Sequence, residues 1–312
     1  MDCAVSIVSI GYFLGVLCRI FAAFGFLYKI HINIVVLWNK MNLQYLSLNK
    51  EFLFNWYEGL IAKSISHLEG KKLTNGKIEY YKQEFLKQYY THFASIKILY
   101  PGLKVIYKGK ENEITASASI LVLIRACLEN YSMFYYIYRN ANSSKEIYFR
   151  FWSWFREGLM SRQRFILPHM TNKQKDEKSQ IDEITKELKQ HSEFLSFSQK
   201  QQKKFLEEGK WYFSGKRRLL ELSGFSKALA LNCYNYFSSY THSTSSSILQ
   251  TSQADFNDSN QITDSMTKAL FIATGLYLHN YSATFQEISE LYNDKDKEFI
   301  LTWCELGREL MK

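Results

Sequence analysis

Two charged residues stand inside one of the most apolar stretches of the sequence. The interior of residues 117–139 is interrupted only by Arg125 and Glu129, which lie four residues apart. Residues at that spacing share one face of an α-helix, and burying an arginine or a carboxylate costs several kcal/mol unless it is paired. We therefore expect polar partners or a polar cleft beside this helix. A guanidinium there can hold a phosphate while a carboxylate orients it, or the pair can be purely architectural.

A second polar face lies nearer the C-terminus. Tyr234, Ser238 and His242 are spaced four apart within residues 225–250, so their side chains line one helical face over two turns. A histidine titrates near neutral pH, and a hydroxyl one turn away can orient it or relay a proton. This face is suited to general acid–base chemistry. The alternative is that His242 only makes hydrogen bonds at the helix end, before a serine-rich loop.

Basic residues elsewhere predict contacts with phosphate. Arg150 and Arg156 are mixed with aromatic residues between positions 145 and 169, a pattern that can stack on the bases of single-stranded nucleic acid. A second basic cluster consists of Lys216, Arg217 and Arg218. Each pattern also has a structural interpretation. The first is a core-facing aromatic stripe with a solvated arginine edge, and the second is a run of solvated charges.

Helices must position these residues. The chain has 312 residues, of which 46% are hydrophobic and only two are proline, which suits a globular core with few tight turns. We expect an all-α multi-helix bundle with a buried polar cluster, forming a single domain over residues 41–312. A charge-rich helical arm is expected at about 172–208, and a brief extended piece at 104–113. Apolar periodicity predicts the other helices at 50–69, 77–99, 117–139, 145–169, 225–250 and, as a pair, within 260–312.

The first 40 residues form a separate hydrophobic segment. Arg19 is the only charge between Ala4 and Tyr28, and about 20 apolar residues suffice to cross a bilayer. The segment is either a membrane anchor, with basic residues such as Lys29 holding the rest of the chain in the cytoplasm, or a spurious in-frame extension upstream of Met41. We therefore expect a cytoplasmic protein, which in the first case is tethered to the inner membrane.

The sequence predicts neither a cofactor nor a metal site. Its five cysteines are far apart, odd in number and without a C-x-x-C pair, which argues against structural zinc and against a disulfide framework. No glycine-rich phosphate loop and no H-E-x-x-H motif occur. The formal net charge of +9 favours anionic partners, such as RNA or a membrane surface.

Several short motifs follow one another in an order that resembles a known family. They are L-I-R-A-C-L-E-N-Y at 123–131, Phe151-Trp152, Lys210-Trp211 leading to Glu221 and Gly224, and Y-x-x-x-S-x-x-x-H at 234–242. In this order they resemble a bacterial helical family catalogued as domain of unknown function 5677, over about residues 50–250. The resemblance implies an all-helical fold and no particular activity. It implies a polar signature at Arg125, Glu129, Tyr234, Ser238 and His242.

Helical families of this general look include HEPN-type ribonucleases and abortive-infection toxins of phage defence. Arg164 and His169 have the R-x-x-x-x-H spacing of the HEPN ribonucleases. The chain departs from that pattern at Phe165, where the family usually has a polar residue, and at Pro168, which would disturb the helical turn.

These patterns predict a metal-independent, ribonuclease-like effector of bacterial anti-phage defence that acts on RNA. His242 would serve as general acid or base, Arg125 would hold the phosphate, and Glu129 would orient the arginine. The rival hypothesis is a non-catalytic helical protein that binds a partner protein or a second copy of itself. A membrane-tethered sensor, anchored through residues 1–40, belongs to the same class.

Overall fold

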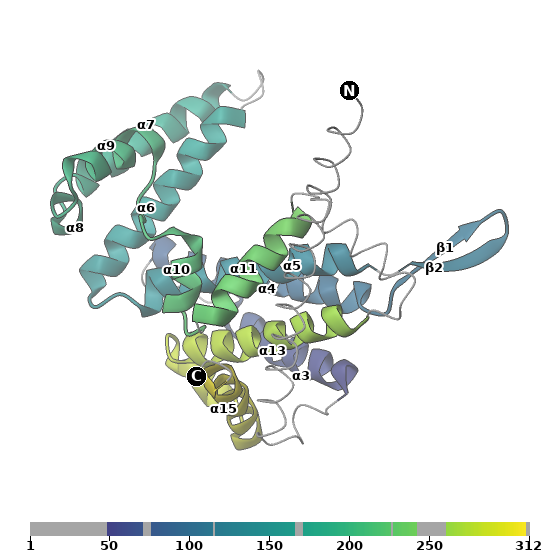
Figure 1. Ribbon diagram of the computed structural model, residues 1–312. Helices are drawn as coiled ribbons and strands as arrows, with labels where there is room; N and C mark the ends of the chain where they lie inside the picture. The colour runs from purple at the N-terminus through teal and green to yellow at the C-terminus, as the bar shows by residue number, and fades with distance from the viewer. Residues whose placement is uncertain are drawn as a thin grey trace, which may run out of the picture. The chain divides into compact units, whose positions relative to one another are not determined.

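The computed structural model describes residues 49–70, 76–114, 116–165, 171–225, 227–241 and 260–309 (Figure 1). The chain divides into two compact units, Met1–Leu53 and Phe54–Lys312. The predicted membrane anchor, residues 1–40, lies outside the described residues. The described part of the second unit is almost entirely helical, which confirms the all-α fold class.

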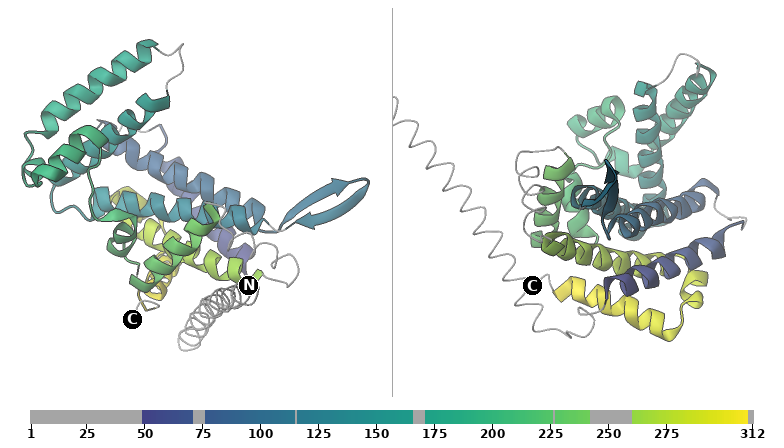
Figure 2. Two further views of the ribbon diagram at one scale, coloured as in Figure 1. Left: turned by 45° about the horizontal axis from the view of Figure 1, so that its top comes forward. Right: turned by 90° about the vertical axis from the view of Figure 1, so that its right-hand side faces the viewer.

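Helix α5 (Ser117–Phe134) is the central element of the second unit, as its apolar sequence predicts. It continues into a turn of π-helix, η1 (Tyr135–Arg139). Helix α4 (Gly76–Leu99) lies beside it (Figure 2), and α13 (Asn260–Ser282) also packs on it. Helix α15 (Asp294–Glu309) packs on α13. These helices, with α3 (Lys50–Leu68) from Phe54 onwards, are called the bundle.

Aromatic side chains fill the interior of the bundle. Tyr57 of α3 is fully buried, and its ring centroid lies 6.4 Å from that of Phe93, 5.9 Å from that of Phe271 and 6.3 Å from that of Trp303. These rings come from four helices, two near the start of the described chain and two near its end. Their burial supplies much of the hydrophobic driving force, and the edge-to-face and stacked ring arrangements add to it.

Two glycines allow the C-terminal helices to approach closely. A Cβ atom added at Gly275 of α13 would lie 2.9 Å from Cβ of Trp303, and one added at Gly307 of α15 would lie 2.6 Å from Cγ2 of Ile272. Both distances are below normal carbon–carbon contact. The α13–α15 packing therefore depends on the absence of side chains at these positions.

The charge-rich sequence 172–208 forms part of a second group of helices. Helix α6 (Ser144–Arg162) ends in a turn of 3-10 helix, η2 (Gln163–Phe165), and packs against α7 (Thr171–Leu188). Helices α8 (Ser192–Leu195) and α9 (Gln199–Glu208) follow. We call α6 to α9 the extension. It is not wholly solvent-facing, because Leu188, Phe194 and Phe205 are buried.

A β-hairpin stands where the sequence predicts a brief extended piece. Strand β1 (Leu103–Tyr107) pairs antiparallel with β2 (Lys110–Ile114), and Figure 1 shows this hairpin projecting from the helices of its own unit. The pairing register places Leu103 opposite Ile114 and Tyr107 opposite Lys110.

The remaining helices include α14 (Gln286–Leu291), which packs on α13, and two that carry predicted site residues. Helix α10 (Gly215–Leu222) and helix α11 (Lys227–Thr241) pack against each other and against α5. Among the described residues, only Ser117–Arg139 is long and apolar enough to span a membrane, and more than half of its most apolar window is buried inside the protein. This is the pattern of a core helix.

Candidate functional site

Arg125 and Glu129 form the ion pair that their spacing predicts. Nε of Arg125 donates a hydrogen bond of 2.8 Å to Oε1 of Glu129 along α5. The arginine side chain is 14% exposed and the glutamate side chain 28% exposed, so the pair lies at the edge of the core and still reaches water. The polar partner that we expected beside this helix comes from α10.

That partner is Lys216, near the N-terminus of α10. Its Nζ atom lies 2.7 Å from the second carboxylate oxygen of Glu129, Oε2, and the lysine side chain is 46% exposed. One carboxylate is thus held between two cations that come from different helices. Lys216 was predicted only as part of a basic run. Its place beside Glu129 depends on α10 packing on α5, which the local pattern does not specify.

The other two residues of the basic run have a carboxylate of their own. Nε of Arg217 lies 3.2 Å from Oε1 of Glu221, and Nη1 of Arg218 lies 2.9 Å from Oε2 of the same residue. Hydrogen bonds from Arg218 and Arg217 lower the pKa of the Glu221 carboxyl below its ordinary value. Glu129 and Glu221 together offset only part of the charge, so this face of α5 and α10 carries more positive than negative groups.

Two of the three residues of the second predicted polar face, Tyr234 and Ser238, belong to α11. Helix α11 packs on α5 and on α10, and Ser238 is half-buried on it. His242 lies outside the described residues, as does the side chain of Tyr234. The packing therefore brings the helix of Tyr234 and Ser238 to the helix of Arg125 and Glu129. Side-chain contacts between the two sets stay a prediction.

A buried tyrosine joins the same elements and was not predicted. The hydroxyl of Tyr131 on α5 donates a hydrogen bond of 2.7 Å to the carbonyl oxygen of Ser223, which follows α10. The amide Nδ2 of Asn280 on α13 lies 3.2 Å from the same hydroxyl. Tyr131 is fully buried, and this burial raises the pKa of its hydroxyl well above the ordinary value. It therefore helps to fix α10 on α5, and the site with it.

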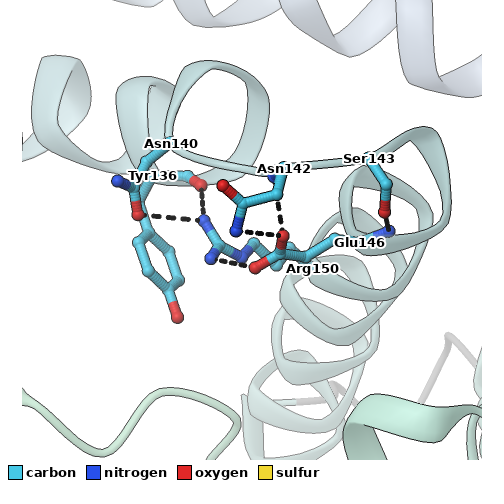
Figure 3. Close-up of polar contacts among 6 residues, drawn as sticks. All are labelled: Tyr136, Asn140, Asn142, Ser143, Glu146 and Arg150. Carbon is cyan, nitrogen blue, oxygen red and sulfur yellow. Dashed lines mark hydrogen bonds and ion pairs between the residues drawn. The ribbon is translucent and has the colours of Figure 1, made fainter.

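The sequence predicts that Arg150 presents its charge to solvent or to nucleic acid, but the structure places it largely inside the protein. Figure 3 shows its guanidinium between the end of α5–η1 and the start of α6, where it pairs with Glu146 and donates to the carbonyl oxygen of Tyr136. It also lies 3.3 Å from Oδ1 of Asn140 and 4.0 Å from the centre of the Tyr136 ring. The nucleic-acid role predicted for Arg150 is corrected accordingly, because these contacts occupy the guanidinium.

Arg156 is also corrected from a nucleic-acid contact to a structural residue. It is 2% exposed, and its guanidinium donates to Oγ1 of Thr185 at 2.5 Å and to the carbonyl oxygens of Phe205 and Leu206 at 2.9 and 3.1 Å. Those carbonyls belong to the last turn of α9, where helical acceptors lack intrahelical donors. Arg156 therefore caps α9 and ties α6 to α7. Burial lowers the pKa of its guanidinium to about 10.

The remaining candidates add no second site. Arg164 is exposed in η2, and His169, its partner in the R-x-x-x-x-H spacing, lies outside the described residues. Across the described ranges, no group of three or more His, Cys, Asp or Glu side chains is arranged to hold a metal ion. The one face in the described chain where predicted site residues meet is therefore that of Arg125, Glu129 and Lys216.

No family model, curated protein or solved structure matches the chain. The resemblance to domain of unknown function 5677, and the looser similarity to HEPN-type and abortive-infection proteins, therefore remain predictions from sequence.

Proposed function

We propose that the protein is a metal-independent ribonuclease-like effector of bacterial anti-phage defence, acting in the cytoplasm on RNA. The observation that carries the proposal is the convergence of Arg125 and Lys216 on the carboxylate of Glu129, at a face that remains open to water. Two cations from different helices, spaced to bracket one anionic group, also suit a phosphodiester. If residues 1–40 insert in the inner membrane, the same activity would be tethered there.

The proposed chemistry is cleavage of the chain by its own ribose. The 2′-oxygen attacks the neighbouring phosphorus, the P–O5′ bond breaks, and the products are a 2′,3′-cyclic phosphate and a free 5′-hydroxyl. Arg125 and Lys216 stabilise the charge on the phosphoryl oxygens, and Glu129 orients both cations. His242 takes the proton of the 2′-hydroxyl or supplies one to the leaving oxygen, water carrying the other proton. Tyr234 and Ser238 orient the imidazole.

A specific observation favours a second candidate, the non-catalytic partner-binding protein. Arg125 and Lys216 pair with Glu129, and Arg217 and Arg218 pair with Glu221. Every cation of this cluster therefore has a carboxylate partner within the chain, and the Lys216–Glu129 pair joins α10 to α5 without any ligand. In this case the polar cluster fixes helix register, and the surface that matters for function lies elsewhere.

The experiment uses the full-length chain, with a labelled RNA and a DNA of the same sequence, in buffer containing EDTA. Wild type is compared with His242→Ala and Arg125→Gln, and with His67→Ala, a histidine paired with Glu287 away from the site. We expect cleavage of RNA but not of DNA, a cyclic phosphate end, and loss of at least about 100-fold in the first two variants.

Equal cleavage by wild type and His242→Ala would identify a contaminating nuclease and remove the proposal. No cleavage by the folded wild type, with reduced thermal stability in Arg125→Gln, would favour the partner-binding candidate. Circular dichroism of every variant separates loss of activity from loss of fold.

A further inference from the structure

The β1–β2 hairpin exposes an unusual amount of apolar surface for so small an element. Ile106 is 76% exposed, and Leu103, Val105 and Ile114 are also exposed. A two-stranded hairpin alone is marginally stable in water, and both edges of this one lack a neighbouring strand in the described part of the chain. Exposed edges of this kind are templates for pairing with another strand.

The turn fixes which backbone groups point outward. Lys108 and Gly109 form a two-residue loop, and both have positive φ angles, 50° and 74°, as in a type I′ turn. In such a hairpin the residues that flank the loop form a hydrogen-bonded pair, and such pairs alternate along the ladder with non-hydrogen-bonded ones. The free N–H and C=O groups are therefore those of Lys104 and Ile106 on β1, and of Glu111 and Glu113 on β2.

The β2 edge cannot pair with its own copy without opposing like charges. An antiparallel match that uses the outward groups of β2 must place Glu111 opposite Glu111, Glu113 opposite Glu113, or Glu111 opposite Glu113. Like charges directly across a ladder are destabilising. All three registers are therefore unfavourable, and the β2 edge is protected against self-association.

The β1 edge has one register without this conflict. Matches centred on Lys104 or on Ile106 oppose Lys104 to Lys104 or to Lys108 of the other copy. The match centred on Val105 instead places Val105 opposite itself, Lys104 opposite Ile106, and Leu103 opposite Tyr107. It opposes no like charges, and it is symmetric about a twofold axis, so the assembly closes at two copies.

We propose that two copies of this chain associate through their β1 strands, antiparallel and centred on Val105, to form a four-stranded sheet. The two outward pairs of Lys104 and Ile106 exchange four backbone hydrogen bonds, and the Val105 side chains meet at the axis. The area buried by two five-residue strands is small, so the dimer is weak and depends on concentration. This inference is independent of the proposed ribonuclease activity.

The first experiment tests the register by cross-linking. In a non-hydrogen-bonded pair the Cα atoms lie about 4.5 Å apart, within the range of a disulfide. Under mild oxidation, full-length Val105→Cys is expected to form a covalent dimer. Lys104→Cys is the matched control, because in this register its two copies are more than about 7 Å apart. An equal yield of covalent dimer from the two variants would overturn the register. So would the absence of covalent dimer from Val105→Cys at a concentration where sedimentation detects dimer.

The second experiment tests which edge pairs. Ile106→Pro removes an outward N–H of β1, whereas Glu111→Pro removes the outward N–H directly across the hairpin on β2. Analytical ultracentrifugation is expected to show concentration-dependent dimerisation for wild type and Glu111→Pro, and monomer for Ile106→Pro. A monomeric wild type at all concentrations would overturn the proposal. If wild type forms assemblies larger than a dimer and both variants lose them, β1 of one copy pairs head-to-tail with β2 of the next. That result would also overturn the proposal.

Discussion

The bundle and the extension place polar groups in their interiors by different means. In the bundle the buried polar atoms include neutral tyrosine hydroxyls, such as that of Tyr89, which lies 2.8 Å from Oγ1 of Thr274. In the extension the most deeply buried charged group described is the guanidinium of Arg156, which has three acceptors within 3.1 Å. A neutral hydroxyl is tolerated in a dry core with one partner, whereas a charge needs several. The bundle should therefore be sensitive to alkali, and the extension to loss of a single side chain.

Alkaline titration should give the largest effect, and it should act on the bundle. Burial raises the pKa values of Tyr57, Tyr89, Tyr131 and Tyr277 well above 10. These hydroxyls stay protonated in the folded state, while the unfolded chain releases its protons above about pH 10. Stability is then complete below pH 10 and falls by about 1.4 kcal/mol per tyrosine for each pH unit above it. The four together account for about 6 kcal/mol at one unit above pH 10.

The measurement is the midpoint of urea unfolding at a series of pH values, with tyrosinate absorbance followed in parallel. Tyr148 of α6 is the internal contrast, because burial and its hydrogen bond to Glu187 raise its pKa only to about 12. Gradual ionisation of all tyrosines without unfolding would contradict the comparison, since it would mean that the bundle hydroxyls reach water.

Arg156→Met should produce the next largest effect, and it should act on the extension. The change leaves Thr185, Phe205 and Leu206 without their donor, and each unpaired buried acceptor costs about 1–3 kcal/mol. We expect a loss of about 3 kcal/mol or more in the free energy of unfolding. The comparison on the same helix is Arg162→Met. Arg162 is exposed, and its partner Glu177 keeps a hydrogen bond from Gln163, so this substitution should cost clearly less than Arg156→Met.

Hydrogen exchange should locate the damage in Arg156→Met. We expect faster exchange in α7 and α9, with protection retained in α4, α5 and α13. If protection falls equally in the bundle, then the two regions unfold as one unit and the contrast between them has no energetic meaning.

The same contrast explains what the sequence could and could not predict. The helix of residues 50–69 was predicted from its apolar period, and α3 spans Lys50–Leu68. Local periodicity suffices there because a helix is defined by its own residues. The hairpin was anticipated only as an extended piece, although the type I′ turn at Lys108-Gly109 fixes its register.

Arg156 was mispredicted because its surroundings come from far along the chain. Its acceptors Phe205 and Leu206 lie about 50 residues away, and their carbonyls are free only because α9 ends there. An arginine next to aromatic residues in the sequence is typical both of a nucleic-acid-binding surface and of a buried arginine that caps a helix, so the pattern alone does not distinguish the two. For Glu129, by contrast, the pairing with Arg125 follows from spacing on one helix, whereas Lys216 required the packing of α10.

Glycine substitutions give a smaller effect with opposite signs in the two regions. Gly275→Ala should destabilise the protein by about 1–3 kcal/mol, because the new methyl group would overlap Trp303 between α13 and α15. Gly158→Ala on α6 should stabilise it by about 0.5–1 kcal/mol, because no atom lies within 4 Å of the added Cβ and alanine restricts the unfolded chain. Thermal unfolding of both variants tests this, and a stabilising Gly275→Ala would mean that α13 and α15 are less closely packed than described.

Lys216→Ala should have the smallest effect on stability, and it bears most directly on function. An ion pair in which lysine is 46% exposed contributes about 0.5 kcal/mol or less. The cost should therefore be far below that of Arg156→Met, although both side chains belong to predicted nucleic-acid-binding groups. If the α5–α10 face binds RNA, the same substitution should weaken binding and reduce the dependence of log K on log salt by about one unit. Lys210→Ala, at an exposed position ahead of α10, is the matched control. A stability loss without any change in salt dependence would place Lys216 with Arg156, as a residue that holds helices together.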